Sequence, residues 1–161
     1  MLTSPLQLLQ ICEWTCLQIH RSKPSKFRLQ INIDFEFPKA PCYILSIDVQ
    51  DIVGTHVVDI EGDLVKNRLD TRGKVIETID YHKKVPDDAN NINKAKEAYK
   101  NHEGCQLKGS FLINKVSGNF HVSFHSYHNT VQALVASGGT LDFTHRIHHL
   151  SFGDDENIQA V

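Results

Sequence analysis

The stretch FRLQINIDFEF, residues 27–37, alternates apolar and polar side chains without interruption. A repeat of two residues is typical of a β-strand, because neighbouring side chains point to opposite faces of a sheet. Pro38 follows directly and ends the pattern, since proline has no N–H to donate to a neighbouring strand. Residues 27–37 therefore predict one long strand with one buried and one solvent-facing side.

Similar patterns follow along the chain. Tyr43–Val49 repeats the alternation and predicts a second strand. Shorter segments separated by glycines and turns predict further strands at Thr55–Ile60, Leu64–Leu69, Lys74–Ile79, Gln106–Val116, Asn119–Phe124 and Leu141–Phe152. In Asn119–Phe124 the pattern points Phe120 inward and His121, Ser123 and His125 outward.

One helix is predicted at about residues 92–101, where Ile92, Ala95 and Tyr99 fall on one face at helical spacing. Val131–Ala136 fits a helical turn or a strand, and the pattern does not decide between them. Many short strands with one short helix predict a mainly β fold, an antiparallel β-sandwich-like domain.

The chain of 161 residues has the length of one domain. Its 17 basic and 19 acidic residues give a net charge of −2, which provides no basic field for a nucleic-acid partner. No apolar run reaches the roughly 20 residues that cross a bilayer. The best candidate, Leu6–Ile19, is interrupted by Glu13 and makes a poor signal peptide.

Histidine is the unusual residue in this composition, with ten in the chain. Six of them lie close together in sequence: His121, His125, His128, His145, His148 and His149. Four-residue spacing suits one metal ion on a helix, but on the predicted strand it separates His121 from His125 by roughly 13 Å. We therefore predict no metal ligands. The six form a candidate pH-responsive surface instead, because imidazole gains charge just below neutral pH.

Catalytic motifs are missing from the sequence. There is no Gly-x-Ser-x-Gly elbow for a nucleophile and no glycine-rich loop for a phosphate or dinucleotide. We predict no enzymatic activity, no catalytic residues and no cofactor. The alternative from another class is a metal-dependent β-barrel enzyme of the cupin kind, using the histidines between His121 and His149.

The four cysteines, Cys12, Cys16, Cys42 and Cys105, allow three pairings. Cys12 and Cys16 have three residues between them, rather than the two of a redox or zinc-ribbon motif. Cys42 and Cys105 each open a predicted strand, so they could meet at one end of a sandwich. The spacing alone leaves the pairing open.

Taken in order, several segments resemble the luminal domain of the endoplasmic reticulum vesicle transporter family, whose members are proteins of the ER–Golgi intermediate compartment and COPII vesicles. The matching segments are LQINIDF (29–35), FPKAPC (37–42), LSIDV (45–49), LVKNRLD (64–70), EGC (103–105), INKVSGNFH (113–121), TH (144–145) and LSFG (150–153). Together they cover roughly residues 27–156.

This resemblance implies a β-sandwich-rich luminal domain held between two transmembrane helices. Members cycle between ER and Golgi as non-enzymatic cargo receptors, retrieve escaped ER proteins, and pair with a related member as hetero-oligomers. The implied location is the ER, intermediate compartment and Golgi membrane, with this domain in the lumen. The paired cysteines of the family match Cys42 and Cys105, which implies that these two form a disulfide.

The chain departs from the family pattern at both ends. Met1–Lys26 lacks the expected first membrane helix, and nothing after Val161 supplies the last strands, the second membrane helix or the cytosolic tail. A cysteine-rich insertion carried by one branch is also missing between Tyr81 and His102. We expect residues 1–26 to be an atypical N-terminal segment and 27–161 a partial luminal domain. The chain is then a fragment, or a truncated paralogue that acts only as a binding module.

Overall fold

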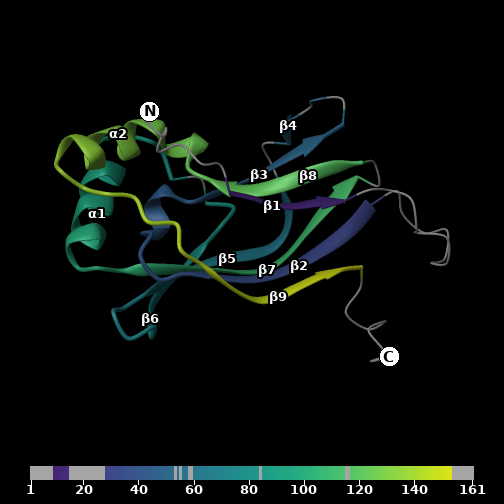
Figure 1. The fold of residues 1–161 in the computed structure, drawn as a ribbon, viewed down its shortest axis with the longest axis horizontal. Helices are drawn as coiled ribbons and strands as arrows, with labels where there is room; N and C mark the ends of the chain where they lie inside the picture. The colour runs from purple at the N-terminus through teal and green to yellow at the C-terminus, as the bar shows by residue number, and fades with distance from the viewer. Residues whose placement is uncertain are drawn as a thin grey trace, which may run out of the picture.

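Two antiparallel β-sheets face each other in the structure, a computed structural model, and two helices lie together at one end of them (Figure 1). The structure describes residues 9–14, 28–52, 54, 56–57, 60–83, 85–114 and 117–153. The mainly β, antiparallel sandwich predicted from the alternating segments is thereby confirmed.

The larger sheet has five strands in the order β6-β5-β7-β2-β9. Their bounds are Arg28–Phe37 for β2, Glu61–Leu69 for β5, Val75–Asp80 for β6, Gly104–Asn114 for β7 and Arg146–Phe152 for β9. The long predicted strand is β2, which pairs with β7 along its whole length, from Arg28 opposite Asn114 to Phe37 opposite Cys105. Since β9 flanks it on the other side, β2 lies inside the sheet.

The smaller sheet has the order β1-β8-β3-β4. Its strands are β1 (Leu9–Trp14), β3 (Ser46–Asp51), β4 (His56–Val57) and β8 (Gly118–Ser123). The first strand comes from the segment predicted to lie outside the domain, and it pairs with β8 from Leu9 opposite Val122 to Trp14 opposite Gly118. The boundary at residue 26 itself stays a prediction.

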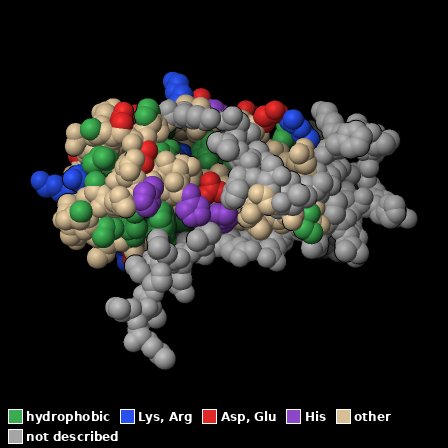
Figure 2. All heavy atoms as spheres, turned by 90° about the horizontal axis from the view of Figure 1, so that it is seen from above, with side chains coloured by type: hydrophobic (Ala, Val, Ile, Leu, Met, Phe, Trp, Pro, Cys, Tyr) green, Lys and Arg blue, Asp and Glu red, His purple; other side chains and the backbone are tan. Residues whose placement is uncertain are grey.

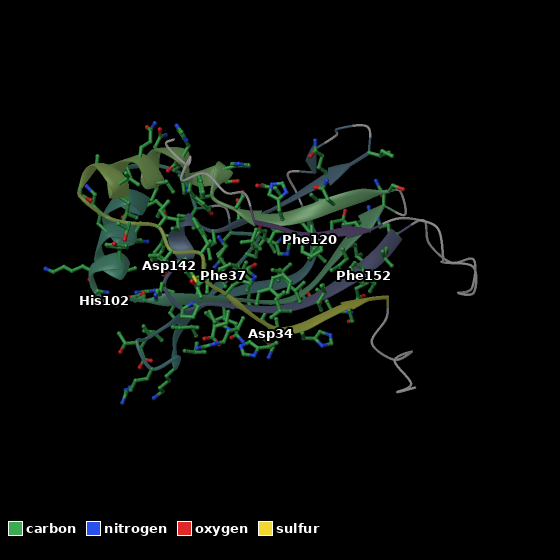
Figure 3. All side chains as sticks on the ribbon, in the orientation of Figure 1. Asp34, Phe37, His102, Phe120, Asp142 and Phe152 are labelled. Atoms are coloured by element: carbon green, nitrogen blue, oxygen red, sulfur yellow. A yellow bond between two sulfur atoms is a disulfide. The ribbon has the colours of Figure 1, made fainter. Side chains whose placement is uncertain are left out.

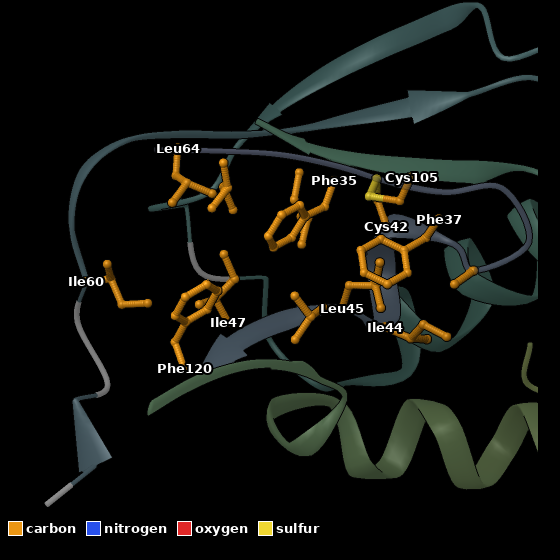
Figure 4. Close-up of a cluster of buried hydrophobic side chains, with 14 of the residues drawn as sticks. Phe35, Phe37, Cys42, Ile44, Leu45, Ile47, Ile60, Leu64, Cys105 and Phe120 are labelled. Atoms are coloured by element: carbon orange, nitrogen blue, oxygen red, sulfur yellow. A yellow bond between two sulfur atoms is a disulfide. The ribbon is translucent and has the colours of Figure 1, made fainter. Parts of the chain in front are cut away.

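Aromatic side chains fill the space between the sheets. Phe35 of β2 stacks on Phe120 of β8 with ring centroids 6.4 Å apart, and Phe111 of β7 meets Phe120 edge-on at 5.5 Å. All three rings are fully buried, and Figure 4 shows Phe35 and Phe120 reaching toward each other from opposite sheets. Burial of such rings is a principal source of stability, because each removes a large apolar surface from water.

The helices are α1 (Ala89–Lys100) and α2 (His128–Ala136), with short 3-10 turns η2 (Cys42–Ile44) and η3 (His125–Tyr127). The predicted helix is α1, which begins at Ala89 because Asp88 caps it by accepting hydrogen bonds from the N–H groups of Asn90 and Asn91. Val131–Ala136, whose pattern fits a helical turn or a strand, forms the C-terminal part of α2. This second helix packs beside α1.

Two predicted strands begin later than expected. The segment from Tyr43 opens with the turn η2, and β3 starts only at Ser46. Tyr43, Ile44 and Leu45 are all buried, so this segment has no solvent-facing side. The last strand likewise starts at Arg146, since residues 141–145 run without strand pairing.

Candidate functional site

The outer face of the smaller sheet carries a line of paired polar residues. Asp48 of β3 lies directly opposite His121 of β8, and Ser46 lies opposite Ser123. Residues directly opposite in an antiparallel pair point to the same side of the sheet, as do residues two apart along a strand. The four side chains therefore share one face, whereas Phe120 points to the other side, into the core.

His125 joins this face because the chain turns back immediately after β8. The strand ends at Ser123, and the turn η3 begins at His125. The His125 ring centroid then lies 5.7 Å from that of His121. The separation of roughly 13 Å predicted for these two histidines is wrong, since it assumed that the strand continues through both residues.

The side chains of His121, His125 and Ser123 converge on one carboxylate oxygen of Asp48. Asp48 Oδ2 lies 3.3 Å from His125 Nδ1 and 3.6 Å from His121 Nε2. The Ser123 hydroxyl donates a hydrogen bond to the same oxygen and accepts one from the His125 backbone N–H at 3.1 Å. Figure 2, which views this side of the molecule, shows histidine side chains gathered beside an acidic one.

Burial differs between the Asp48 carboxylate and the two imidazoles. The side chains of His121, Asp48 and His125 are 7%, 20% and 49% exposed, respectively. The outward direction predicted for His121 is correct for the sheet, yet the side chain is buried. This arrangement holds a carboxylate and two imidazoles together, with His125 the most exposed of the three, and we call it the Asp48 cluster.

The other four predicted histidines lie elsewhere. His128 is the exposed first residue of α2. His145, just before β9, packs its half-buried ring against Phe37 at 5.7 Å. His148 Nε2 lies 2.8 Å from Glu36 Oε2, and His149 Nε2 lies 2.9 Å from Ser151 Oγ. The structure thus brings together only two of the six, and β9 carries its histidines on the other sheet.

A groove of about 470 Å³ crosses the outer face of the larger sheet. Its lining includes Asp34 of β2, Asp63 of β5, Lys108 of β7 and His149 of β9, and Figure 3 shows Asp34 on the side of the sheet away from the core. Lys108 Nζ lies 3.1 Å from Asp34 Oδ2, so the lining carries both signs of charge.

Gly109 of β7 allows the backbones of β7 and β5 to approach closely on one side of this groove. It has φ +129°, and a Cβ at this position would collide with the Asp63 carbonyl oxygen. The alternation of residues 27–37 predicts the polar lining from β2, but the lining from β5, β7 and β9 is brought beside it only by strand pairing. Sequence reasoning missed the groove for that reason.

The disulfide implied by the resemblance is confirmed. Cys42 of η2 and Cys105 of β7 are bonded, both buried, and 63 residues apart in sequence. This bond ties the turn between the two sheets to the larger sheet.

Lys66 lies close to the disulfide and is fully buried. Its ammonium group donates hydrogen bonds to the backbone oxygens of Leu45 and Cys42, the latter at 3.4 Å. The rings of Tyr81 and Tyr127 flank it, with centroids 5.2 and 5.0 Å from Nζ. Burial lowers the pKa of Lys66 to about 7, because a charged amine is poorly solvated there. No sequence pattern marks this lysine as buried.

Comparison with known families places the chain. The sequence model of the family "Endoplasmic reticulum vesicle transporter" matches residues 71–160, which is more than half of the chain, and that of the family "Endoplasmic Reticulum-Golgi Intermediate Compartment (ERGIC)" matches residues 10–58. The chain belongs to the endoplasmic reticulum vesicle transporter family. The resemblance drawn from the short segments is confirmed.

Relatives in this family carry names of the same compartment. The chain is 33% identical over 139 residues to endoplasmic reticulum-Golgi intermediate compartment protein 1 of Xenopus laevis, with 86% of this chain and 35% of that protein covered. It is 28% identical over 188 residues to the probable intermediate compartment protein 3 of Dictyostelium discoideum, with 80% and 49% covered. The chain thus spans about a third to a half of these relatives.

Among solved structures, the crystal structure of Erv41p matches with a TM-score of 0.49 and 21% identity, covering 85% of this chain and 62% of that one.

In the part of the chain that the structure describes, no helix is long and apolar enough to cross a bilayer. The predicted location, in the ER–Golgi compartments, is confirmed by the family and its relatives. This vesicle transporter domain therefore belongs to a family of ER–Golgi transport.

Proposed function

We propose that this domain binds client proteins without catalysis, as the luminal part of a membrane cargo receptor that cycles between ER and Golgi and retrieves ER proteins. The observation that carries the proposal is the pair of family matches, to residues 10–58 and 71–160. A rigid sandwich suits a receptor, because loops and strand faces on a fixed scaffold hold a binding surface in shape.

The groove on the larger sheet is the surface we propose for clients. It is open and about 470 Å³ in volume, and its lining carries charges of both signs from β2, β5 and β7. Protein contacts across such a surface are specific when charges complement each other, and each mismatch is penalised. Asp63 is the residue to test, since it is exposed on the groove rim and has no part in the core.

The proposed partner is a related member of the same family in a hetero-oligomer. Proteins named intermediate compartment protein 1, 2 and 3 all match this chain, so related members exist as a set. Membrane association is proposed for the full-length family protein rather than for this stretch alone.

The test removes the protein from its own cells and measures the contents of ER-derived vesicles by quantitative proteomics. We expect the amounts of a subset of soluble luminal proteins, and of one related family member, to fall several-fold in these vesicles. Wild-type protein should restore them, and Asp63→Lys should not. The matched control is Glu97→Lys, the same charge change at an exposed position on α1. Unchanged vesicle contents after removal would disprove the receptor role.

The pH response predicted for the histidines stays a prediction, and the same cells test it for the four outside the Asp48 cluster. His148 faces Glu36 of β2 beside Arg146, and His149 shares the groove with Asp34, Asp63 and Lys108. Clients cross-linked at pH 7.2 and at pH 6 should differ in amount for wild type. If these four carry the response, replacing His128, His145, His148 and His149 with Gln should remove the difference; a persisting difference would exclude these four from the pH-responsive surface.

A further inference from the structure

Two imidazoles and one carboxylate meet at the Asp48 cluster, and their ligand atoms all lie within 4.8 Å of one another. A tetrahedral Zn²⁺ ion binds nitrogen and oxygen at about 2.0–2.2 Å, which places its ligand atoms about 3.3–3.6 Å apart. The two distances from Asp48 Oδ2, 3.3 and 3.6 Å, already match this spacing. Closing the cluster on an ion thus needs small side-chain movements.

We propose that Asp48, His121 and His125 bind one Zn²⁺ ion, which clamps the turn η3 against strand β3. The site is independent of client binding, because it lies on the smaller sheet and the groove lies on the larger one. It replaces the prediction of no metal ligands, whose geometric reason does not hold in the folded chain.

The chemistry of the three side chains favours zinc over calcium and magnesium. Imidazole nitrogen is a good ligand for zinc, whereas calcium and magnesium take oxygen ligands almost exclusively. A set of two histidines and one carboxylate gives three protein ligands and leaves the fourth position to water. The half-exposed His125 lies on the solvent side of the cluster and gives the ion and that water a way in.

The surroundings hold the ligands in place. Asp48 and His121 are anchored on paired strands, directly opposite each other. The Ser123 hydroxyl bonds both the Asp48 carboxylate and the His125 backbone, so it orients one ligand and positions the next. Hydrogen bonds of this kind around a ligand shell strengthen metal binding tenfold or more.

A bound ion would have a mechanical effect as well. Residues 125–127 form η3, and α2 follows without a break at His128. A clamp between His125 and Asp48 therefore fixes the start of α2 relative to the smaller sheet. Zinc should raise the unfolding temperature, because a ligand that binds only the folded state stabilises it.

The test is zinc titration of the chelator-treated, disulfide-intact protein by calorimetry, together with thermal unfolding. We expect one Zn²⁺ per chain, an unfolding temperature raised by several degrees, and no competition from Ca²⁺ or Mg²⁺. His125→Ala and Asp48→Asn should each weaken binding at least tenfold. His148→Ala, a matched change on β9, should leave binding unchanged.

Two measurements keep the result decisive. Circular dichroism of His125→Ala, which alters a half-exposed residue outside the strands, verifies that this variant folds. X-ray absorption of the zinc-loaded wild type should show only nitrogen and oxygen neighbours at about 2.0 Å. Sulfur neighbours at about 2.3 Å would assign the ion to Cys12 and Cys16 and overturn the proposal. Equal binding by wild type and His125→Ala would overturn it too.

Discussion

Lys66 keeps its ammonium group in the interior without an acidic partner among the hydrogen bonds and ion pairs of the described residues. Its contacts are two backbone oxygens and the faces of two tyrosine rings. Carbonyl dipoles and aromatic faces attract a cation, but they replace only part of the hydration it loses. This is why the pKa of Lys66 falls to about 7, from an ordinary value of 10.5.

The lowered pKa of Lys66 predicts a pH-dependent stability. Between pH 7 and 10.5 the unfolded chain binds the proton and the folded chain does not, so the free energy of unfolding rises with pH in this window. Below pH 7 both the folded and the unfolded chain bind the proton, so Lys66 no longer makes the free energy of unfolding depend on pH. Between pH 7.5 and 9 we expect the free energy of unfolding of wild type to rise by about 2 kcal/mol relative to that of Lys66→Met. This follows from about 1.4 kcal/mol per pH unit.

Urea unfolding at several pH values measures this difference. Lys96→Met, a change at an exposed lysine of α1, serves as the control and should run parallel to wild type. If Lys66→Met also runs parallel to wild type, the ammonium group does not lose its proton in this range.

At the scale of elements, one short loop determines where both helices begin. Asp88 caps α1 with its own side chain. Its neighbour Asp87 accepts hydrogen bonds at α2, from the N–H of Asn129 at 2.7 Å and the N–H and hydroxyl of Thr130 at 2.9 and 2.6 Å. Burial alone would raise the pKa of Asp87, yet the hydrogen bonds from Thr130 and Asn129 outweigh it and lower the pKa. The two adjacent carboxylates thus join the helices.

Removing the two caps should loosen different helices. We expect Asp87→Ala and Asp88→Ala each to lower the free energy of unfolding by about 1 kcal/mol, the usual contribution of a cap. Hydrogen exchange separates them. Asp87→Ala should speed exchange in α2, and Asp88→Ala in α1. Equal protection of α2 in both variants would contradict the role given to Asp87.

The strand ends decide how the histidines are placed. Alternation correctly predicts that Phe120 points inward and His121 outward, since this follows from the pleat of β8. The predicted strand ends at Phe124, one residue beyond Ser123, but the pattern does not predict that the chain then turns back toward His121, because this turn depends on how η3 packs against β3. The Asp48 cluster was therefore beyond sequence reasoning, although each of its histidines was singled out.

At the scale of the whole molecule, the disulfide closes a long loop. Cys42 and Cys105 are 63 residues apart, and the segment between them includes β3, β5, β6 and α1. Cross-linking so long a loop reduces the entropy of the unfolded chain and stabilises the fold by about 4 kcal/mol in the chain-entropy description. The ER lumen is oxidising and allows a bond of this kind to persist.

Removing the disulfide should lower the stability of the entire sandwich. We expect Cys42→Ala with Cys105→Ala to lose about 2–4 kcal/mol in urea unfolding, and reduction of wild type to cause a similar loss. Adding a reductant to the double variant should have no further effect. A further loss there would mean that another cysteine pair contributes.

The amino-acid sequence alone determined the fold class and the family of this protein. Period-two alternation over residues 27–37 and the ordered short segments are local signals, and they persist wherever the chain folds as strands. The tertiary structure alone decided the helical state of α2, the burial of Lys66, the groove and the Asp48 cluster. Each of these depends on groups far apart in sequence, such as Asp87 with Thr130 or Asp48 with His125, and only packing of the two sheets and helices brings such groups into contact.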